Sequence, residues 1–144
     1  MAADTGLQVI TLPAEIIQLE KALGFIRTIA ESAACPNEIE QVIELAVEEI
    51  FVNIARYAYP ETEPGEVRIG CKLDRTLKHA RLIIVFADRG KPYNPLEHPD
   101  PDITVPIEER EIGGLGLLMV KRIMDKVQYE YTNGWNRLVI MKSW

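Results

Sequence analysis

The fold is decided by one stretch in the middle of the chain, Glu66–Asp88, which reads EVRIGCKLDRTLKHARLIIVFAD. Apolar side chains occupy every second position from Val67 to Leu73, and this period of two predicts a strand with one side in water. After the short turn RTLKH, the run ARLIIVFAD is almost continuously apolar, as expected of a central strand. Because the connection is short, the two strands should pair antiparallel.

Two helices are predicted before this stretch. Apolar residues recur at steps of three and four from Ile16 to about Ser32, and again over residues 37–57. A short extended segment, Leu7–Leu12, precedes them. Pro13 follows it and suits the first turn of a helix, where its missing N–H does no harm.

Beyond the central strand, residues 90–112 form a long proline-rich stretch without periodicity, and loops of such length are usually functional or disordered. A helix over about 114–125 and strands over 127–131 and 136–142 complete the chain, with Asn133-Gly134 as a hairpin signal. The order predicts an α+β fold in a single domain, residues 1–144. We expect a two-layer sandwich, with a mixed, mostly antiparallel sheet of about five strands and three helices on one face.

Composition narrows the class of protein. The net charge of −6 and the pI of about 5.0 argue against nucleic-acid binding, which normally needs a basic face. Cys35 and Cys71 form no C-x-x-C pair, which argues against a disulfide framework or a zinc site and favours a reducing compartment. With no signal peptide and no long apolar run, we expect a cytoplasmic protein without a membrane partner.

Three polar or glycine-rich stretches interrupt the expected elements. On the second helix, Glu49 and Asn53 are four residues apart and share a face beside its apolar stripe. Either Glu49 reaches water from the edge of the stripe, or both side chains point into a cavity. There the carboxylate could accept a proton and the amide oxygen could bind Mg²⁺.

The second stretch, DRGKPYNP, begins at Asp88, directly after the central strand. It can be an ordinary turn. However, a carboxylate at the inner end of an apolar strand is costly unless a donor satisfies it. The amino group of adenine would do so, and Gly90 would let the base approach the backbone.

The third stretch, Gly113–Asp125, reads GGLGLLMVKRIMD. Its glycines can form a simple hinge. Alternatively, they let the backbone wrap phosphates at the N-terminus of a helix, where free N–H groups and a partial positive charge favour anions.

In order and spacing, the three stretches resemble the N, G1 and G2 boxes of the gyrase–chaperone–histidine-kinase ATPases, which share the Bergerat fold. Over Leu7–Lys142 the chain is most similar to the bacterial anti-sigma-factor serine kinases. The resemblance implies ATP and Mg²⁺ as cofactors, Glu49 as general base and Asn53 as the Mg²⁺ ligand. The implied nucleotide contacts are Asp88, Gly90 and Pro92 in the G1 loop, and Gly113, Gly114, Leu115, Gly116 and Leu117 in the G2 box.

The resemblance also implies a lid, Glu97–Ile112, and an arginine that reaches the γ-phosphate. Pro92 stands where the superfamily usually has a second glycine. The arginine could be Arg110, before the G2 glycines, or Arg56, after Asn53.

The function that follows is a serine/threonine kinase acting in transcription regulation. It would phosphorylate a small anti-sigma-factor antagonist, sequester a sigma factor and form a homodimer. An alternative is an ATP-binding interaction module without phosphotransfer. A third is a catalytic fragment of a sensor histidine kinase, but neither His79 nor His98 lies in a helical pattern.

Overall fold

The computed structural model describes residues 6–97 and 114–144. Its strands are β1 (Gln8–Pro13), β2 (Glu66–Arg75), β3 (Ala80–Asp88), β4 (Lys126–Thr132) and β5 (Trp135–Ser143). The helices are α1 (Leu19–Ser32), α2 (Asn37–Tyr57) and α3 (Gly114–Ile123), with short 3₁₀ turns η2 (Ile16–Gln18) and η3 (Pro95–Glu97).

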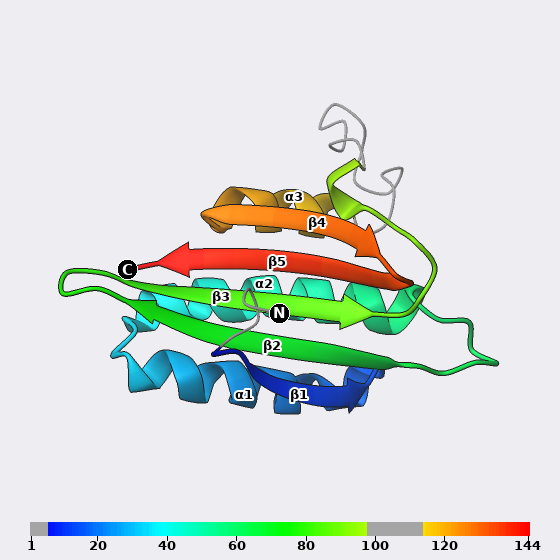
Figure 1. The fold of residues 1–144 in the computed structure, drawn as a ribbon, viewed down its shortest axis with the longest axis horizontal. Coiled ribbons are helices and arrows are strands. Elements are labelled where there is room, and N and C mark those ends of the chain that lie inside the picture. The colour runs from blue at the N-terminus through cyan, green and yellow to red at the C-terminus, as the bar shows by residue number, and fades with distance from the viewer. Residues whose placement is uncertain (1–5, 98–113) are drawn as a thin grey trace.

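The five strands form one sheet in the order β1-β2-β3-β5-β4 (Figure 1). All four pairings between described strands are antiparallel, so the expectation of a mixed sheet was wrong in this detail. The reason lies in the last hairpin. β4 runs parallel to β3, but β5 returns between them and pairs with both, so no two neighbouring strands are parallel.

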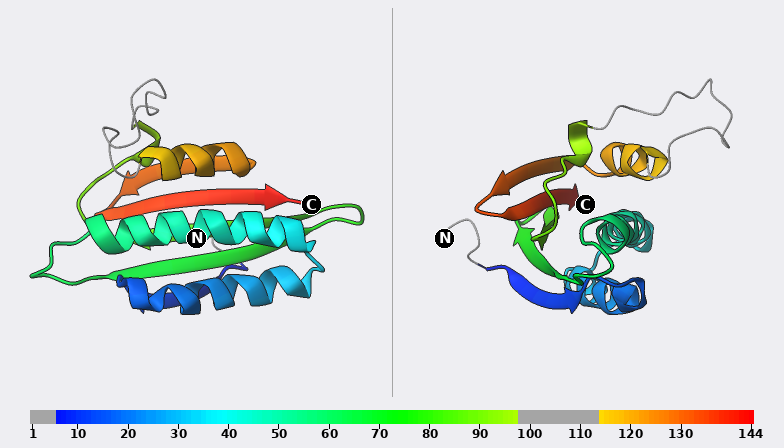
Figure 2. Two further views of the ribbon diagram at one scale, coloured as in Figure 1. Left: turned by 180° about the vertical axis from the view of Figure 1, so that it is seen from behind. Right: turned by 90° about the vertical axis from the view of Figure 1, so that its right-hand side faces the viewer.

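The helices form a second layer on one face of the sheet, which confirms the predicted two-layer sandwich (Figure 2). α2 lies between α1 and α3, and its buried residues include Val47, Ile50 and Phe51. Strand residues that point toward the helices, such as Ile69 and Ile84, are fully buried. At about 1.5–3 kcal/mol for each fully buried large apolar side chain, this interface is the main source of stability.

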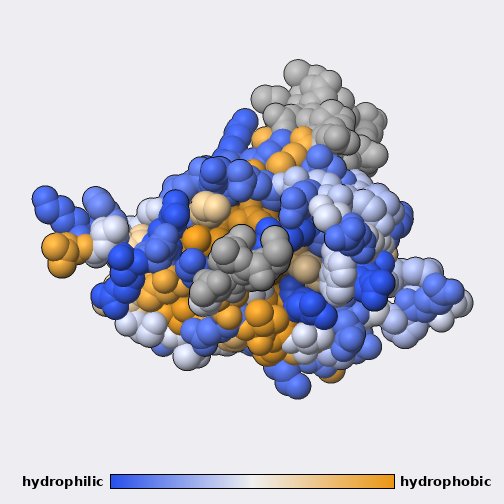
Figure 3. Space-filling view, in the orientation of Figure 1, coloured by the Kyte–Doolittle hydropathy of each residue, from blue (hydrophilic) through white to orange (hydrophobic). Residues whose placement is uncertain are grey.

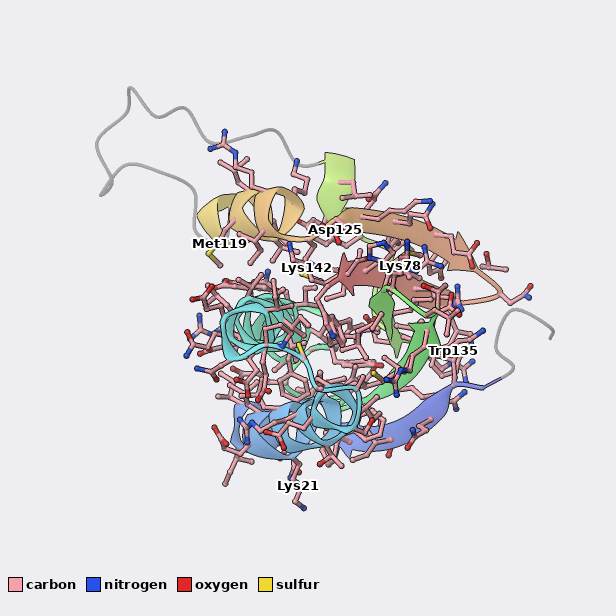
Figure 4. The ribbon with its side chains drawn as sticks, turned by 90° about the vertical axis from the view of Figure 1, so that its left-hand side faces the viewer. Lys21, Lys78, Met119, Asp125, Trp135 and Lys142 are labelled. Carbon is pink, nitrogen blue, oxygen red and sulfur yellow. The ribbon has the colours of Figure 1, made fainter. Side chains whose placement is uncertain are left out.

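Hydrogen bonds and ion pairs at the surface connect the helices to neighbouring elements. Arg27 of α1 donates from Nε to Glu44 of α2 at 2.9 Å. At the end of α3, Lys142 Nζ donates to the carbonyl of Ile123 at 2.8 Å and lies 3.4 Å from Asp125 Oδ1 (Figure 4). Within residues 6–97 and 114–144, no helix has both the length and the apolarity needed to cross a membrane.

The other face of the sheet carries no helix among the described elements. Apolar surface gathers there between charged side chains (Figure 3). Trp135 lies on this side (Figure 4), with the guanidinium of Arg68 at 4.6 Å and that of Arg89 at 5.3 Å from its ring centre. Asp88 and Asn136, which pair across β3 and β5, point to the opposite, helix-covered face, where both side chains are buried.

Most predicted boundaries agree with the structure, and α2 and the start of α3 do so to the residue. Pro13 is an exception. It does not begin a helix but ends β1, opposite Glu66 at the sheet edge, where a missing N–H is tolerated.

Candidate functional site

A cavity of about 270 Å³ lies between α2, the end of β3, α3 and the hairpin β4–β5. Its walls are largely apolar, with Ile50, Phe86 and Leu138 among the lining residues. Asn53 and Asp88 add polar groups to this lining. A mostly apolar cavity with a few fixed polar groups is typical of a small-molecule site, and its volume suits a single ring system.

Asp88 is the charged group at the inner end of this cavity. It is the last residue of β3, points to the helix side of the sheet and is only 5% exposed. Gly90 N donates to its Oδ1 at 2.9 Å, and Asn136 Nδ2 donates to the same atom at 3.0 Å. Both hydrogen bonds that described residues donate to this carboxylate end on Oδ1, so Oδ2 is the atom left for a donor on a ligand.

The pKa of Asp88 is raised above its ordinary value because burial disfavours the charged form. The hydrogen bonds from Asn136 and Gly90 oppose this effect. A buried carboxylate that uses one oxygen for hydrogen bonds within the protein can accept a hydrogen bond from a ligand with the other oxygen. Such a group is a candidate for ligand recognition.

Gly90 is needed for a reason that the sequence did not reveal. In the structure it packs on the end of α2, and the expected close approach of an adenine base to Gly90 stays a prediction. A Cβ added at Gly90 would overlap the carbonyl oxygen of Ala58 and would lie 2.7 Å from the Ala58 carbonyl carbon. Lys91 N also donates to the Ala58 carbonyl at 3.2 Å, so the loop after β3 is held against α2.

Tyr59 holds the same turn from the other side. Its hydroxyl donates to the Glu66 carbonyl at 2.6 Å and accepts from Arg89 N at 2.8 Å. Burial raises the pKa of Tyr59, which favours the neutral phenol that can both donate and accept a hydrogen bond. The turn that carries Asp88 is thus fixed by α2, β2 and β5 together.

Glu49 and Asn53 share one face of α2, as their spacing predicted, and this face looks toward α3. Asn53 lines the cavity. The Glu49 carboxylate packs directly on Gly116, where an added Cβ would overlap Oε2 and lie 2.9 Å from the carboxyl carbon. The carboxylate therefore sits beside the first turn of α3.

α3 begins at Gly114, so Gly114, Leu115, Gly116 and Leu117 carry the N–H groups that have no partner within the helix. These groups and the helix dipole favour an anion next to this turn. The side chain of Leu117 also lines the cavity. The cavity therefore extends from Asp88, the predicted contact of the adenine base, to Leu117 in the first turn of α3, where the phosphates are predicted to bind.

The structure does not bring every predicted residue to the cavity. Arg56 and Pro92 are exposed and are not among the lining residues. Glu49, Gly90 and Gly116 are not lining residues either, so of the predicted residues Asn53, Asp88 and Leu117 are the ones found in the lining. Arg110, Gly113 and most of the expected lid, residues 98–112, lie outside the described residues.

The sequence analysis missed most of the lining residues, among them the polar Lys91, Tyr93, Tyr129 on β4 and Asn136 on β5. Asn136 is 7% exposed and bonds Asp88, so it belongs to the site. The sequence could have indicated Asn136. In NRLVIMK the inward positions are Asn136, Leu138 and Ile140, and a polar residue at an inward position is as unusual here as Asp88 is at the end of β3.

An adenine nucleotide fits this arrangement. Oδ2 of Asp88, which receives no hydrogen bond from a described residue, suits an amino group, and the apolar walls suit a ring. The glycine at 116 leaves the first turn of α3 without a side chain there. In the described part of the chain, no three His, Cys, Asp or Glu residues gather as a metal site of their own. A cation would therefore depend on Asn53 together with the phosphates of the nucleotide.

Comparison with known proteins finds relatives that are named as protein kinases. Over 119 residues the chain is 25% identical to the serine/threonine-protein kinase BtrW of Bordetella bronchiseptica, which covers 83% of this chain and 81% of BtrW. It is 28% identical over 111 residues to the serine-protein kinase RsbW of Oceanobacillus iheyensis and 32% identical over 107 residues to RsbW of Bacillus thuringiensis. These two alignments cover 71% and 72% of this chain but only 63% of each RsbW.

The profile of one protein family matches residues 12–142, nearly the whole chain. The matched region contains α2, the turn after β3 and α3, which build the cavity. The chain belongs to the family of the histidine kinase-like ATPase domain.

Proposed function

We propose that this protein is an ATP-dependent serine/threonine kinase of the anti-sigma-factor type. The observation that carries the proposal is the position of Glu49. Its carboxylate lies against Gly116 in the first turn of α3. Asn53, four residues further along α2, lines the cavity together with Asp88. Asn53 and Asp88 thus line one cavity, and the proposed general base, Glu49, lies one helical turn before Asn53 on α2 and beside the first turn of α3.

Phosphoryl transfer depends mainly on positioning and on neutralising charge. Bound ATP would supply the phosphoryl group, and Mg²⁺ would neutralise part of its charge. In this chain, Asp88 would hold the adenine amino group and the N–H groups of the first turn of α3 would hold phosphate oxygens. Asn53 would offer its amide oxygen to the metal, while Glu49 would accept the proton of the attacking serine or threonine hydroxyl.

The names of the relatives support a protein substrate. BtrW and RsbW are named as serine or serine/threonine kinases. For this chain we propose a small anti-sigma-factor antagonist as phosphoacceptor and a sigma factor as second partner, in the cytoplasm and with the kinase as a homodimer.

An ATP-binding interaction module without transfer is the second candidate. It is favoured by the contrast between the many hydrogen bonds around Asp88 and the exposed position of Arg56, outside the cavity. Such a module would bind ATP with the same base end but would leave its partner unmodified.

The test is transfer of labelled phosphate from ATP to a small anti-sigma-factor antagonist from the same genome. Replacing a general base typically costs a factor of about 10²–10⁴. We expect Glu49→Gln to lose transfer by at least about 100-fold while its affinity for ADP changes by less than about threefold.

Glu48→Gln is the matched control, because Glu48 is the exposed neighbour of Glu49 on α2. It should transfer phosphate at the wild-type rate. Transfer by Glu49→Gln at that rate would contradict the assigned role. ADP binding without transfer by the wild type would favour the interaction module.

A further inference from the structure

Asn136 is the centre of the hydrogen-bond network at the base end of the site. Its Nδ2 donates to Asp88 Oδ1 at 3.0 Å, to the Lys91 carbonyl at 2.9 Å and to the Gly90 carbonyl at 3.3 Å. Its Oδ1 accepts from Tyr93 N at 3.1 Å and from the hydroxyl of Tyr129. One side chain therefore joins β3, the loop after β3, β4 and β5.

The orientation of the Asn136 amide is fixed by these partners. Three acceptors surround Nδ2, while a backbone N–H and a hydroxyl face Oδ1. A flipped amide would place its oxygen against a carboxylate and two carbonyls, and its NH₂ against the N–H of Tyr93. Such a loss of buried hydrogen bonds is strongly unfavourable.

The same bonds set the direction of the Asp88 carboxylate. Oδ1 is held by Asn136 from β5 and by Gly90 N from the loop. With one oxygen anchored from two sides, the carboxylate cannot rotate without breaking both bonds. Its other oxygen, Oδ2, is then presented in a constant direction.

We propose that Asn136 is a positioning residue for nucleotide recognition: it anchors Asp88 and the backbone at Gly90 and Lys91, so that Asp88 Oδ2 faces the amino group of a bound adenine. Tyr129 supports this role by fixing the amide of Asn136. The proposal rests on the proposed function for its ligand, but the contact between Asn136 and Asp88 can be tested without one.

The chemistry of the cavity makes the test clear. Asp88 is the carboxyl among the described residues that line it, and the other titratable lining groups are Tyr57, Lys91, Tyr93 and Tyr129. Outside the lining, Tyr59 and Arg89 lie close enough to interact with Asp88 or its turn. The carboxyl of Glu66 also interacts with Tyr59 beside this turn, so the carboxyl signal of Asp88 has to be followed by itself in the acid range.

Asn136→Asp places a second carboxyl against Asp88. Two carboxylates in contact share a proton, so the pair should bind a proton at least about tenfold more tightly than Asp88 does in the wild type. We expect this in ¹³C carboxyl titrations of the protein without nucleotide. Asn133→Asp is the matched control: it makes the same change of charge at an exposed residue in the same hairpin, and it should leave Asp88 unchanged.

Calorimetric titration with ADP gives the second result. At pH 7.5, Asn136→Asp should bind ADP at least about tenfold more weakly than the wild type or Asn133→Asp. Its affinity should recover as pH falls to 6, because a shared proton restores a donor to Asp88 Oδ1. The wild type should show no such recovery.

A measurement on the wild-type protein tests the role of Asn136 even if the Asn136→Asp variant does not fold. The side-chain NH₂ of Asn136 should exchange with solvent at least about 100-fold more slowly than that of Asn133. Equal exchange, or an Asp88 titration identical in Asn136→Asp and Asn133→Asp, would overturn the role of Asn136. Absence of ADP binding by the wild type would overturn the proposed function and leave the contact to be judged by titration and exchange.

Discussion

The two ends of the site are built differently. At the base end, Asp88 and the turn after it are held by Asn136, Tyr59 and the end of α2 through several hydrogen bonds. At the phosphate end, the corresponding feature is the packing of Glu49 on Gly116. Among the described residues, the proposed adenine end is held by these hydrogen bonds, whereas the proposed phosphate end offers the N–H groups of the first turn of α3 and the carboxylate of Glu49.

This difference assigns separate tasks to the two ends. A rigid network in the core selects a ligand at low cost in conformational entropy, because its groups are already ordered. The Glu49 side chain, beside the first turn of α3, can instead adjust to the reacting groups through its rotatable bonds. We therefore expect substitutions at the base end to change folding and binding together, and those at the phosphate end to change transfer alone.

Gly90→Ala should have the largest effect on the fold. Its Cβ would overlap the Ala58 carbonyl, so backbone must shift, and overpacking of this kind costs about 1–3 kcal/mol. We expect thermal unfolding at a temperature lower by roughly 3–10 °C, since 1 kcal/mol corresponds to about 2–4 °C at this size. ADP binding should be lost at the same time.

Gly24→Ala provides the control for this prediction. Gly24 lies inside α1, where an added Cβ meets no atom within 4 Å. The substitution should stabilise the protein by about 0.5–1 kcal/mol and leave ADP binding intact. A Gly90→Ala protein as stable as wild type would show that the turn is not held against α2.

Gly116→Ala should separate folding from chemistry. Its Cβ meets the flexible end of Glu49, so the carboxylate can swing away and stability should change by less than about 1 kcal/mol. Phosphate transfer should fall by about tenfold to 100-fold, because a displacement of about 1 Å is enough for such a loss.

The double variant Glu49→Gln with Gly116→Ala sharpens this prediction. If Gly116 acts through Glu49, the second substitution should add little to the first, as expected for residues in contact. Additive losses in transfer would show that Gly116 acts on the phosphates by itself.

Asp88→Asn should have the smallest effect on stability, and it should stabilise the protein rather than destabilise it. Because the pKa of Asp88 is raised in the folded state, the unfolded chain releases this proton first as pH rises. The ionised carboxylate therefore costs stability above its folded pKa and has no cost below pH 3.8, its unfolded value.

At pH 7, we expect Asp88→Asn to raise the unfolding temperature by about 1–3 °C, which corresponds to less than about 1 kcal/mol. The difference should shrink as pH falls toward 4. Asp74→Asn, at an exposed position on β2, should show no such gain. A less stable Asp88→Asn protein at pH 7 would mean that the two hydrogen bonds outweigh the burial.

Much of the fold was predictable because periodicity reports burial directly. The alternating pattern from Val67 to Leu73 and the apolar run of β3 specified the sheet, and polar residues at inward positions indicated Asp88. Glu49 and Asn53 were found by the same logic on α2.

The remaining features depend on contacts between distant segments. The packing of Gly90 on Ala58 joins residues 32 positions apart, and the bond from Asn136 to Asp88 spans 48 positions. No local pattern contains such pairs. The insertion of β5 beside β3 likewise depends on how the last hairpin returns, which sequence periodicity does not specify.

The central claim is that this cavity binds an adenine nucleotide through Asp88. Calorimetric titration of ADP with Mg²⁺ into the wild type, Asp88→Asn and Asp74→Asn tests it most directly. We predict one nucleotide bound per chain in the wild type and in Asp74→Asn, and a loss of at least about 100-fold in Asp88→Asn. This loss corresponds to about 2.7 kcal/mol, within the range for a hydrogen bond to a charged group. No binding by the wild type, or equal affinity in all three proteins, would contradict the account.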